Sequence, residues 1–479
     1  MSHAEVLLAH AYFVEDDPRP LGFMHPLPPL HPAELAAWLE QEAGATVELW
    51  DPTFRLGADC FAVEASRRRP ELMFLYAHPT TRPAGLKLLR IARRAGLAVV
   101  VGGPDAGLRP RTWLEGGADA VLPGECEDAL LQLLLALRAG HYRPSPELLS
   151  RVPGLLYLDG NGEVKRSAGK YRPVDLDRVP WPQRPTEATR IHLERWRDHR
   201  KFRPLALASA RGCPVRCGFD TGTVFNRPYR RRAPADVVAE MRSLVDTFEV
   251  DRLVFVDEIF FFDAHWLREF AALLAKEPTR IPFEGRGHPA GLDAQTARRL
   301  RDVGLVRIDL EAASGSSRLL RSLDWSYGPA DVYRAVDIVR GLEAVSVGLN
   351  VLVGLPGETR EDLDQTMELV RVVQPDGVDV TRVDPGAPAL FRRDWERVVA
   401  GPIAERGVGQ RALPEPVLDA AVRWMRSVGT AADPDLVDRV RGAVDRVRRP
   451  LLRAAVRLLP GRGPIGPEAP EPARLLPRG

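Results

Sequence analysis

One stretch of the sequence decides how the fold is interpreted: Arg211-Gly212-Cys213-Pro214-Val215-Arg216-Cys217-Gly218-Phe219-Asp220. The apolar run before it, residues 205–210, predicts a short buried strand, so the stretch itself is expected to be a loop. Cys213 and Cys217 have three residues between them, and Asp220 follows three positions after the second cysteine. Two thiolates so close together on one loop suit a soft metal or an iron–sulfur cluster, with Asp220 as a further candidate ligand.

The cysteine pair also has other interpretations. Two neighbouring cysteines are often only small buried side chains. A disulfide is not expected in a reducing compartment. A structural zinc site needs four ligands, usually with a second cysteine pair nearby, and none follows in this sequence. The rest of the chain therefore has to decide between these interpretations.

Composition and charge exclude several classes of protein. The chain has 479 residues, of which 45% are hydrophobic and 28% charged, an ordinary globular composition with room for two or three domains. A net charge of +2 gives no field that would recruit nucleic acid or an anionic membrane. Four cysteines exclude a disulfide scaffold. The sequence shows no signal peptide and no apolar run of ~20 residues, so we expect a cytoplasmic protein.

Residues 1–145 are expected to form a first domain, in which short apolar runs alternate with amphipathic helices. Strands are predicted at 6–9, 46–50, 72–76, 97–101 and 120–122, and helices near 32–39, 83–95 and 126–137. This alternation predicts a doubly wound, mostly parallel, Rossmann-like sheet. Ligands of such sheets bind at the carboxyl ends of the strands, here at the turns Gly102-Gly103-Pro104 and Gly124-Glu125.

Three turns of this first domain resemble those of the cobalamin-binding domain that precedes many radical S-adenosylmethionine (SAM) domains. They are Pro28-Pro29-Leu30, Val101-Gly102-Gly103-Pro104 and Pro123-Gly124-Glu125. The glycines would let the backbone approach a large flat ligand, where a Cβ would clash. The resemblance implies that cobalamin contacts Gly102, Gly103, Pro104, Asp105, Gly124 and Glu125.

An alternative for this domain is a Rossmann-like fold whose glycines serve only as turns. The Asp-x-His-x-x-Gly pattern, which supplies a lower cobalt ligand in other cobalamin proteins, is missing. Any bound cobalamin is therefore expected to lack that histidine ligand.

Residues 146–200 are expected to be a small hairpin and a linker, and residues 201–390 a second α/β domain. Six strands are predicted there, at 205–210, 252–256, 280–286, 305–310, 346–353 and 377–383. Helical patterns lie between them, at 234–247, 264–276, 293–303, 329–342 and 359–373. This order predicts a partial (β/α)6 barrel, in which chemistry takes place at the carboxyl ends of the strands. The cysteine loop falls directly after the first of these strands.

The cysteine loop and the barrel pattern together resemble the radical SAM enzymes, whose loop has the form Cys-x3-Cys-x-aromatic-Cys. In this chain Asp220 stands in the place of the third cysteine. The resemblance implies that Cys213, Cys217 and Asp220 hold three irons of a [4Fe–4S] cluster, while the fourth iron binds SAM. A carboxylate is a harder donor than a thiolate and suits iron less well. The replacement of the third cysteine by Asp220 therefore bears most directly on the cluster.

The resemblance also implies where SAM lies, at the carboxyl ends of the barrel strands. The residues expected to bind it are Asp257, Glu258, Arg286, Glu311 and Ser314. The stretch Glu311-Ala312-Ala313-Ser314 is a second departure, because it has alanine where relatives carry a SAM-binding glutamate. The run Arg230-Arg231-Arg232 resembles the entry to the first barrel helix of the family and is expected to position the cysteine loop rather than to contact nucleic acid.

The end of the chain carries little functional signal. Residues 391–459 are expected to be helical, with patterns at 416–428 and 434–447. Residues 460–479 are rich in proline, glycine and arginine, which predicts a disordered tail.

The resemblance leaves three interpretations of function open. The first is a cobalamin-dependent radical SAM-type enzyme that catalyses methyl transfer, or a related modification of an unactivated carbon, in specialised metabolism. Its partners would be a small-molecule substrate and an external electron donor, with no nucleic acid and no membrane. The second is an enzyme of the same fold that uses cobalamin or SAM without radical chemistry, and the third is a catalytically degenerate partner subunit.

Overall fold

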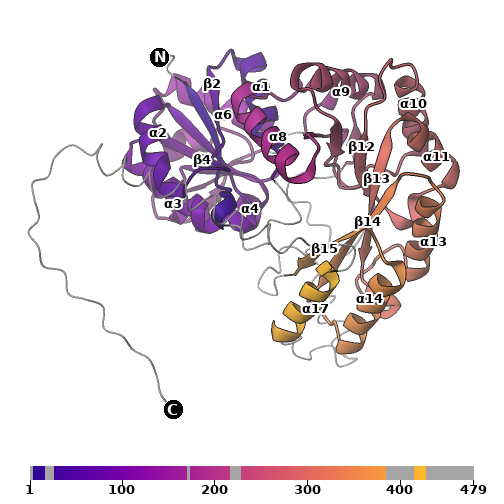
Figure 1. Ribbon diagram of the computed structural model, residues 1–479. Helices are drawn as coiled ribbons and strands as arrows, with labels where there is room; N and C mark the ends of the chain where they lie inside the picture. The colour runs from indigo at the N-terminus through magenta and orange to yellow at the C-terminus, as the bar shows by residue number, and fades with distance from the viewer. Residues whose placement is uncertain (1–3, 17–25, 170–172, 216–227, 384–414, 428–479) are drawn as a thin grey trace, which may run out of the picture. The chain divides into compact units, whose positions relative to one another are not determined.

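The computed structural model describes residues 4–16, 26–169, 173–215, 228–383 and 415–427 (Figure 1). All of them fall within one compact unit of the chain. Several sequence predictions lie outside these residues: Cys217, Asp220, the helix at 434–447 and the tail at 460–479. Within the described part, no helix is both long enough and apolar enough to cross a membrane.

The first sheet has seven strands in the order β2-β1-β3-β4-β5-β6-β7. The first five are parallel, and the last two add an antiparallel hairpin, so the hairpin expected after residue 145 extends this same sheet. The strand order reverses at β1, which pairs with both β2 and β3 and creates the switch point of a doubly wound sheet. The strands are β1 (Val6–His10), β2 (Val47–Trp50), β3 (Leu72–Tyr76), β4 (Ala98–Gly102), β5 (Ala120–Leu122), β6 (Leu156–Leu158) and β7 (Val164–Arg166).

Helices cover both faces of this sheet because its central strands are apolar on both sides. Val6 and Leu8 of β1 pack into one core with Leu39 and Leu133, whereas Leu7 packs into another. The first core is covered by α1 (Leu30–Ala43) and α6 (Glu127–Ala139). The second core is covered by α2 (Phe61–Arg68), α3 (Arg82–Arg94) and α5 (Pro110–Glu115). The doubly wound sheet expected from the sequence is confirmed.

The second sheet has six parallel strands in the sequential order β8-β11-β12-β13-β14-β15. Its strands are β8 (Pro204–Leu207), β11 (Arg252–Phe255), β12 (Phe283–Gly287), β13 (Leu305–Ala313), β14 (Ser346–Val353) and β15 (Gly377–Arg382). The helices between them are α9 (Pro234–Phe248), α10 (Ala264–Leu274), α11 (Ala294–Val303), α13 (Pro329–Arg340) and α14 (Arg360–Val373), and Figure 1 shows them along one side of the sheet. The partial barrel is confirmed.

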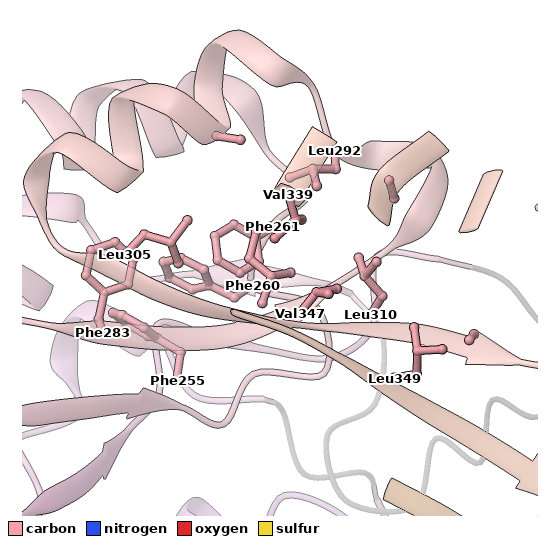
Figure 2. Packing of buried hydrophobic residues seen from close by; sticks show 14 of the residues in the cluster. Phe255, Phe260, Phe261, Phe283, Leu292, Leu305, Leu310, Val339, Val347 and Leu349 are labelled. Atoms are coloured by element: carbon pink, nitrogen blue, oxygen red, sulfur yellow. The ribbon is translucent and has the colours of Figure 1, made fainter. Parts of the chain in front are cut away.

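The core of the partial barrel lies between the sheet and its helices. Phe255, Phe260 and Phe283 are almost fully buried there, and the rings of Phe255 and Phe260 stack with centroids 4.0 Å apart (Figure 2). Alternate strand residues such as Glu284 and Arg286 on β12 leave this core and face the other side of the sheet. The apolar side thus holds the barrel together, and the polar side is left for ligands.

Some elements were not predicted. The segment expected to be a linker contains α8 (Thr186–Arg200), a polar helix with only Leu193 among its apolar residues fully buried. Two-residue strands, β9 (Ala210–Arg211) and β10 (Arg230–Arg231), form a short antiparallel hairpin. The helix predicted at 416–428 is confirmed as α17 (Glu415–Ser427), and its Leu418 and Met425 join the barrel core.

Candidate functional site

The hairpin of β9 and β10 brackets the cysteine loop. Arg211 pairs with Arg230 in this hairpin, so residues 212–229 leave and return at one place beyond the carboxyl end of β8. Cys213 is partly exposed there, as expected for a ligand. Cys217 and Asp220 lie outside the described residues, and among those described no group of three or more His, Cys, Asp or Glu could hold a metal ion. The three-residue ligand set therefore stays a prediction.

Asp257, which was expected to bind SAM, anchors the chain that leads into this hairpin. Its Oδ1 accepts hydrogen bonds from the backbone N–H groups of Ser209 and Ala210, at 2.7 and 2.8 Å. Its Oδ2 accepts from the Ser209 hydroxyl at 2.5 Å. The side chain is buried, and this burial raises the pKa of Asp257 against the opposing effect of those hydrogen bonds. Asp257 thus joins the end of β11 to the residues between β8 and β9.

Three residues expected at the SAM site do lie on the polar side of the barrel. Glu258 follows β11, Arg286 is on β12 and Glu311 is on β13. The Arg286 Nε lies 3.9 Å from Glu311 Oε1, and Asn350 on β14 donates to the same oxygen at 2.8 Å. The guanidinium of Arg286 is half exposed. Burial raises the pKa of both Glu258 and Glu311.

This group of Glu258, Arg286, Glu311 and Asn350, here called the strand-end polar group, offers two carboxylates, a guanidinium and an amide. Such groups can bind the amino, carboxylate and hydroxyl groups of a polar ligand. Asn350 was missed in the sequence, although its place two residues after Gly348 on an expected strand puts it on the inner face.

An ion pair lies on β13 nearer to its amino end. Arg307 donates to Asp309 Oδ1 from Nε at 2.9 Å and from Nη2 at 2.6 Å, and both residues point to the inner face of β13. A Cβ on Gly348 of the neighbouring strand would lie 1.9 Å from that oxygen. The pair therefore occupies the space beside Gly348 on the inner face.

Ser314 differs from its expected role. It is fully buried, and its hydroxyl lies 2.9 Å from the Thr366 hydroxyl on α14. It also accepts a hydrogen bond from the Ser316 backbone N–H at 3.1 Å. The side chain packs against α14 and does not face the inner side of the barrel, and it follows a register shift in β13 between Glu311 and Ala313. Ser314 thus joins β13 to α14, and as it lies here no ligand can reach it.

The glycines of the first sheet are required by packing within the protein. Gly103 has a φ of 95°, and a Cβ there would lie 2.7 Å from the Ala77 carbonyl oxygen. A Cβ on Gly102 would lie 2.5 Å from the Phe74 ring. Both glycines are therefore required for packing against β3 and the residue after it, and their expected contact with cobalamin stays a prediction.

The polar residues expected at this edge also have partners within the protein. Asp105 is fully buried, and it accepts from Arg82 Nε at 2.7 Å and from Trp113 Nε1 at 3.0 Å. Pro104 begins α4 (Pro104–Leu108), a position that suits its fixed φ. Gly124, with a φ of 80°, makes the turn before Glu125. The Asp105 carboxylate is thus bonded within the protein, while the expected contacts of Pro104, Asp105 and Gly124 with cobalamin stay predictions.

Glu125 makes contacts of a different kind, to the hairpin around the cysteine loop. Its Oε1 accepts from Arg211 Nη1 at 2.7 Å, and its Oε2 accepts from Arg230 Nη2 at 2.5 Å. Glu34 on α1 and Glu127 on α6 also contact Arg211, at 3.1 and 2.6 Å. Burial disfavours the charged form of Arg211, but the three carboxylates outweigh it and raise the pKa of Arg211.

The other two arginines of the Arg230-Arg231-Arg232 run have separate partners. Arg231 lies over the Trp266 ring at 3.7 Å and donates to the Ser209 hydroxyl at 3.1 Å. Arg232 donates to Glu240 at 2.6 Å and to the Ala208 carbonyl at 2.8 Å. Arg231 and Arg232 thus contact the residues that lead into the loop, and the expectation that the run positions the loop itself stays a prediction.

A buried His–Asp–His group was missed at the carboxyl ends of β1 and β2. Asp51 accepts from His10 Nε2 at 3.0 Å and from His192 Nε2 at 2.7 Å. Burial works against the charged carboxylate, but these two hydrogen bonds outweigh it and hold the pKa of Asp51 well below its usual range. The sequence did not reveal this group because His192 belongs to α8, a helix that was not predicted.

Comparison with protein families supports the interpretation of the second sheet. Residues 207–370 match the sequence model of the Radical SAM superfamily, so the chain contains a radical SAM family domain. That segment runs from the end of β8 into α14 and includes the cysteine loop.

Curated relatives with similar sequences include two cyclases and a methyltransferase. The anaerobic magnesium-protoporphyrin IX monomethyl ester cyclase of Cereibacter sphaeroides is 27% identical over 289 residues, 58% of this chain and 45% of the relative. The cyclase of Rubrivivax gelatinosus is 24% identical, over 73% of this chain and 63% of the relative. An uncharacterised methyltransferase of Pyrococcus horikoshii is 22% identical, over 63% of each chain. This chain thus spans about half to two thirds of the length of these relatives.

Solved structures with the same fold include two with bound cobalamin. The radical SAM methyltransferase TsrM from Kitasatospora setae, with cobalamin and a [4Fe–4S] cluster bound, superposes with a TM-score of 0.64 at 20% identity, over 86% of this chain and 76% of TsrM. The cobalamin-dependent SAM radical enzyme OxsB gives a TM-score of 0.64 at 16% identity, over 86% of this chain and 57% of OxsB. At these identities the likeness shows the fold alone, and the fold is that of a doubly wound sheet joined to a partial barrel.

Proposed function

We propose that this chain is a cobalamin-dependent radical SAM-type enzyme that transfers a methyl group to, or otherwise modifies, an unactivated carbon of a small molecule. The observation that supports this most is Cys213, partly exposed at the start of a loop bracketed by β9 and β10, beyond the first strand of a radical SAM family domain. The strand order of the first sheet and its likeness to structures with bound cobalamin support the second cofactor.

Different groups of residues would have different roles in such a site. Cys213, together with Cys217 and Asp220 in the part of the loop outside the description, would supply the cluster ligands. The strand-end polar group would hold the amino acid and ribose parts of SAM. When bound, the reduced cluster would supply the electron that cleaves SAM, and cobalamin would carry the methyl group. Asp257 and Ser314 would position their neighbours instead of touching SAM, because their polar atoms are already bonded within the protein.

An enzyme of the same fold without radical chemistry is a second candidate, and the observation that favours it is Asp220 in a ligand position of the loop. An oxygen ligand donates less charge to iron than a thiolate and shifts the potential of a cluster. A catalytically degenerate partner subunit would follow if the cluster did not form at all.

Cofactor content tests the proposal directly. The protein is produced with hydroxocobalamin, reconstituted anaerobically with iron and sulfide, and analysed by visible spectroscopy and iron determination. We expect corrin absorbance and about four irons per chain in the wild type. Cys213→Ala should lose most of the iron, whereas the control Cys60→Ala, a partly buried cysteine of the first sheet domain, should keep it. Wild-type protein with neither corrin nor iron would contradict the proposal.

A further inference from the structure

The β9–β10 hairpin around the cysteine loop is too short to be stable without contacts to other elements. Strands β9 and β10 pair through only two residue pairs, Arg211 with Arg230 and Ala210 with Arg231. A two-stranded ribbon of this length is not stable alone. The place at which residues 212–229 begin and end therefore depends on side chains that reach the hairpin from other elements.

Glu125 reaches both strands of this hairpin with one carboxylate. One oxygen accepts from Arg211 at 2.7 Å and the other accepts from Arg230 at 2.5 Å. Because Arg211 and Arg230 are opposite each other in the pairing register, the carboxylate bridges the two ends of the loop. Glu34 and Glu127 contact Arg211, but of the three carboxylates described around it, Glu125 is the one with a contact to Arg230 as well.

Burial makes this bridge strong and its loss costly. Glu125 is 4% exposed and Arg211 is 3% exposed. Hydrogen bonds between buried charged groups are short and strong, and removal of one partner leaves the other charge without compensation. Arg230 is further fixed by a hydrogen bond from its Nη1 to the Val174 carbonyl at 2.5 Å, in the segment before α8. The second end of the loop is thus tied to residues that follow the first sheet.

We propose that Glu125 is a positioning residue for the metal-binding loop, and that its carboxylate fixes the separation of Arg211 and Arg230 and so the place where Cys213 begins the loop. This inference rests on the proposed function for the identity of the metal group, but the bridge itself consists of described residues. It gives the turn after β5 a role in the second sheet's site, where the sequence resemblance assigned it to cobalamin.

The test compares Glu125→Gln with Asp105→Asn. Glutamine keeps the size of the side chain but places an amide N–H₂ against an arginine donor. The control changes a buried carboxylate of the same sheet domain, Asp105, whose described side-chain hydrogen bonds go to Arg82 and Trp113. Both variants should lose global stability. Hydrogen exchange measured by mass spectrometry then separates a general loss of stability from a local loosening of residues 210–231.

We expect exchange in peptides that cover residues 210–231 to rise at least about tenfold in Glu125→Gln and to stay at the wild-type rate in Asp105→Asn, whose extra exchange should fall near residues 82–113. In reconstituted protein, a chelator should remove iron several-fold faster from Glu125→Gln than from either other protein. Equal exchange of residues 210–231 in wild type and Glu125→Gln would overturn the inference, as would the same increase in the control. If the wild type binds no iron, the proposed function fails, while the exchange comparison still decides the role of Glu125.

Discussion

At the scale of single residues, Glu358 in the loop after β14 is buried where its ionised form is unfavourable. Its Oε2 accepts a hydrogen bond from the Gly354 backbone N–H at 2.6 Å, while its Oε1 is buried and has no hydrogen-bond partner among the described residues. Burial raises the pKa of Glu358 to about 7. The folded state binds a proton at Glu358 more tightly than the unfolded chain does. The contribution of this proton to the free energy of unfolding should therefore be fully present below about pH 4.5 and be lost as the pH rises through 7.

Glu358→Gln should remove this dependence. The amide oxygen can still accept from Gly354, and no proton is lost at high pH. Relative to wild type, we expect the variant to gain about 1–3 kcal/mol of unfolding free energy between pH 4.5 and pH 8.5. Urea unfolding at the two pH values measures the change. Glu361→Gln, at an exposed position on the next helix, is the control and should show almost none. An identical pH dependence in wild type and Glu358→Gln would refute the explanation.

Gly103 provides a second prediction at this scale. Its φ of 95° and the 2.7 Å approach of a Cβ to the Ala77 carbonyl oxygen mean that any side chain is strained there. Gly103→Ala should cost about 2–4 kcal/mol of unfolding free energy. Gly160→Ala, in the turn of the β6–β7 hairpin with no atom within 4 Å of the new Cβ, should change it little. If both variants unfold at the same denaturant concentration as wild type, the packing argument fails.

The same residues show where sequence reasoning stops. Glycines at strand ends could be found from the sequence, but Phe74 and Ala77 become their neighbours only when β3 pairs with β4. Ser314 was placed on the correct strand end, yet its side chain packs against Thr366 on α14. The position of a strand follows from periodicity, whereas the partner of one side chain at its irregular end does not.

At the scale of elements, Asp362 joins the starts of two helices. It accepts from the Thr359 backbone N–H at 2.8 Å and so completes a capping box at the start of α14. It also accepts from the Ser316 hydroxyl at 2.5 Å, and Ser316 caps α12 (Ser317–Ser322). Burial opposes the charged form, but Arg318, Ser316 and Thr359 outweigh it and lower the pKa of Asp362 to about 2.

Asp362→Asn should therefore destabilise the protein in a pH-dependent way. The carboxylate contributes stability that is present above pH 4 and is lost as the pH falls through about 2. We expect a loss of about 1–2 kcal/mol at pH 7 that shrinks toward pH 2.5, measured by thermal or denaturant unfolding. Asp364→Asn removes only a half-exposed pair with Arg360 and should have little effect at any pH. A deficit of the same size at both pH values would show that the charge of Asp362 is not what matters.

Element prediction worked well for the strands that alternate with helices, which were predicted to within a few residues. Those of the first sheet are short apolar runs buried on both faces, whereas those of the second, such as β12, are apolar on one face only. The helix α8 was missed because most of its residues are polar, and only Leu193 among its apolar side chains is fully buried. The two-residue strands β9 and β10 carry no periodic signal at all, although they bracket the cysteine loop.

At the scale of the whole molecule, the order of the two sheets could be expected from the sequence, but the contacts across them could not. Glu125 and Arg211 are far apart in the chain, and only the folded protein shows that the turn after β5 contacts the residue before the cysteine loop. The His10–Asp51–His192 group is a similar case, since it forms only when α8 lies against the ends of β1 and β2. Long-range polar contacts of this kind leave no pattern in a single sequence.

Cleavage of SAM tests the central claim most directly. Reconstituted protein is incubated anaerobically with SAM and a strong reductant, and 5′-deoxyadenosine is measured by liquid chromatography and mass spectrometry. We expect the wild type to form it, Cys213→Ala to form none, and the control Cys60→Ala to match the wild type. Wild-type protein that has bound iron and sulfide but forms no 5′-deoxyadenosine would contradict radical chemistry in this chain.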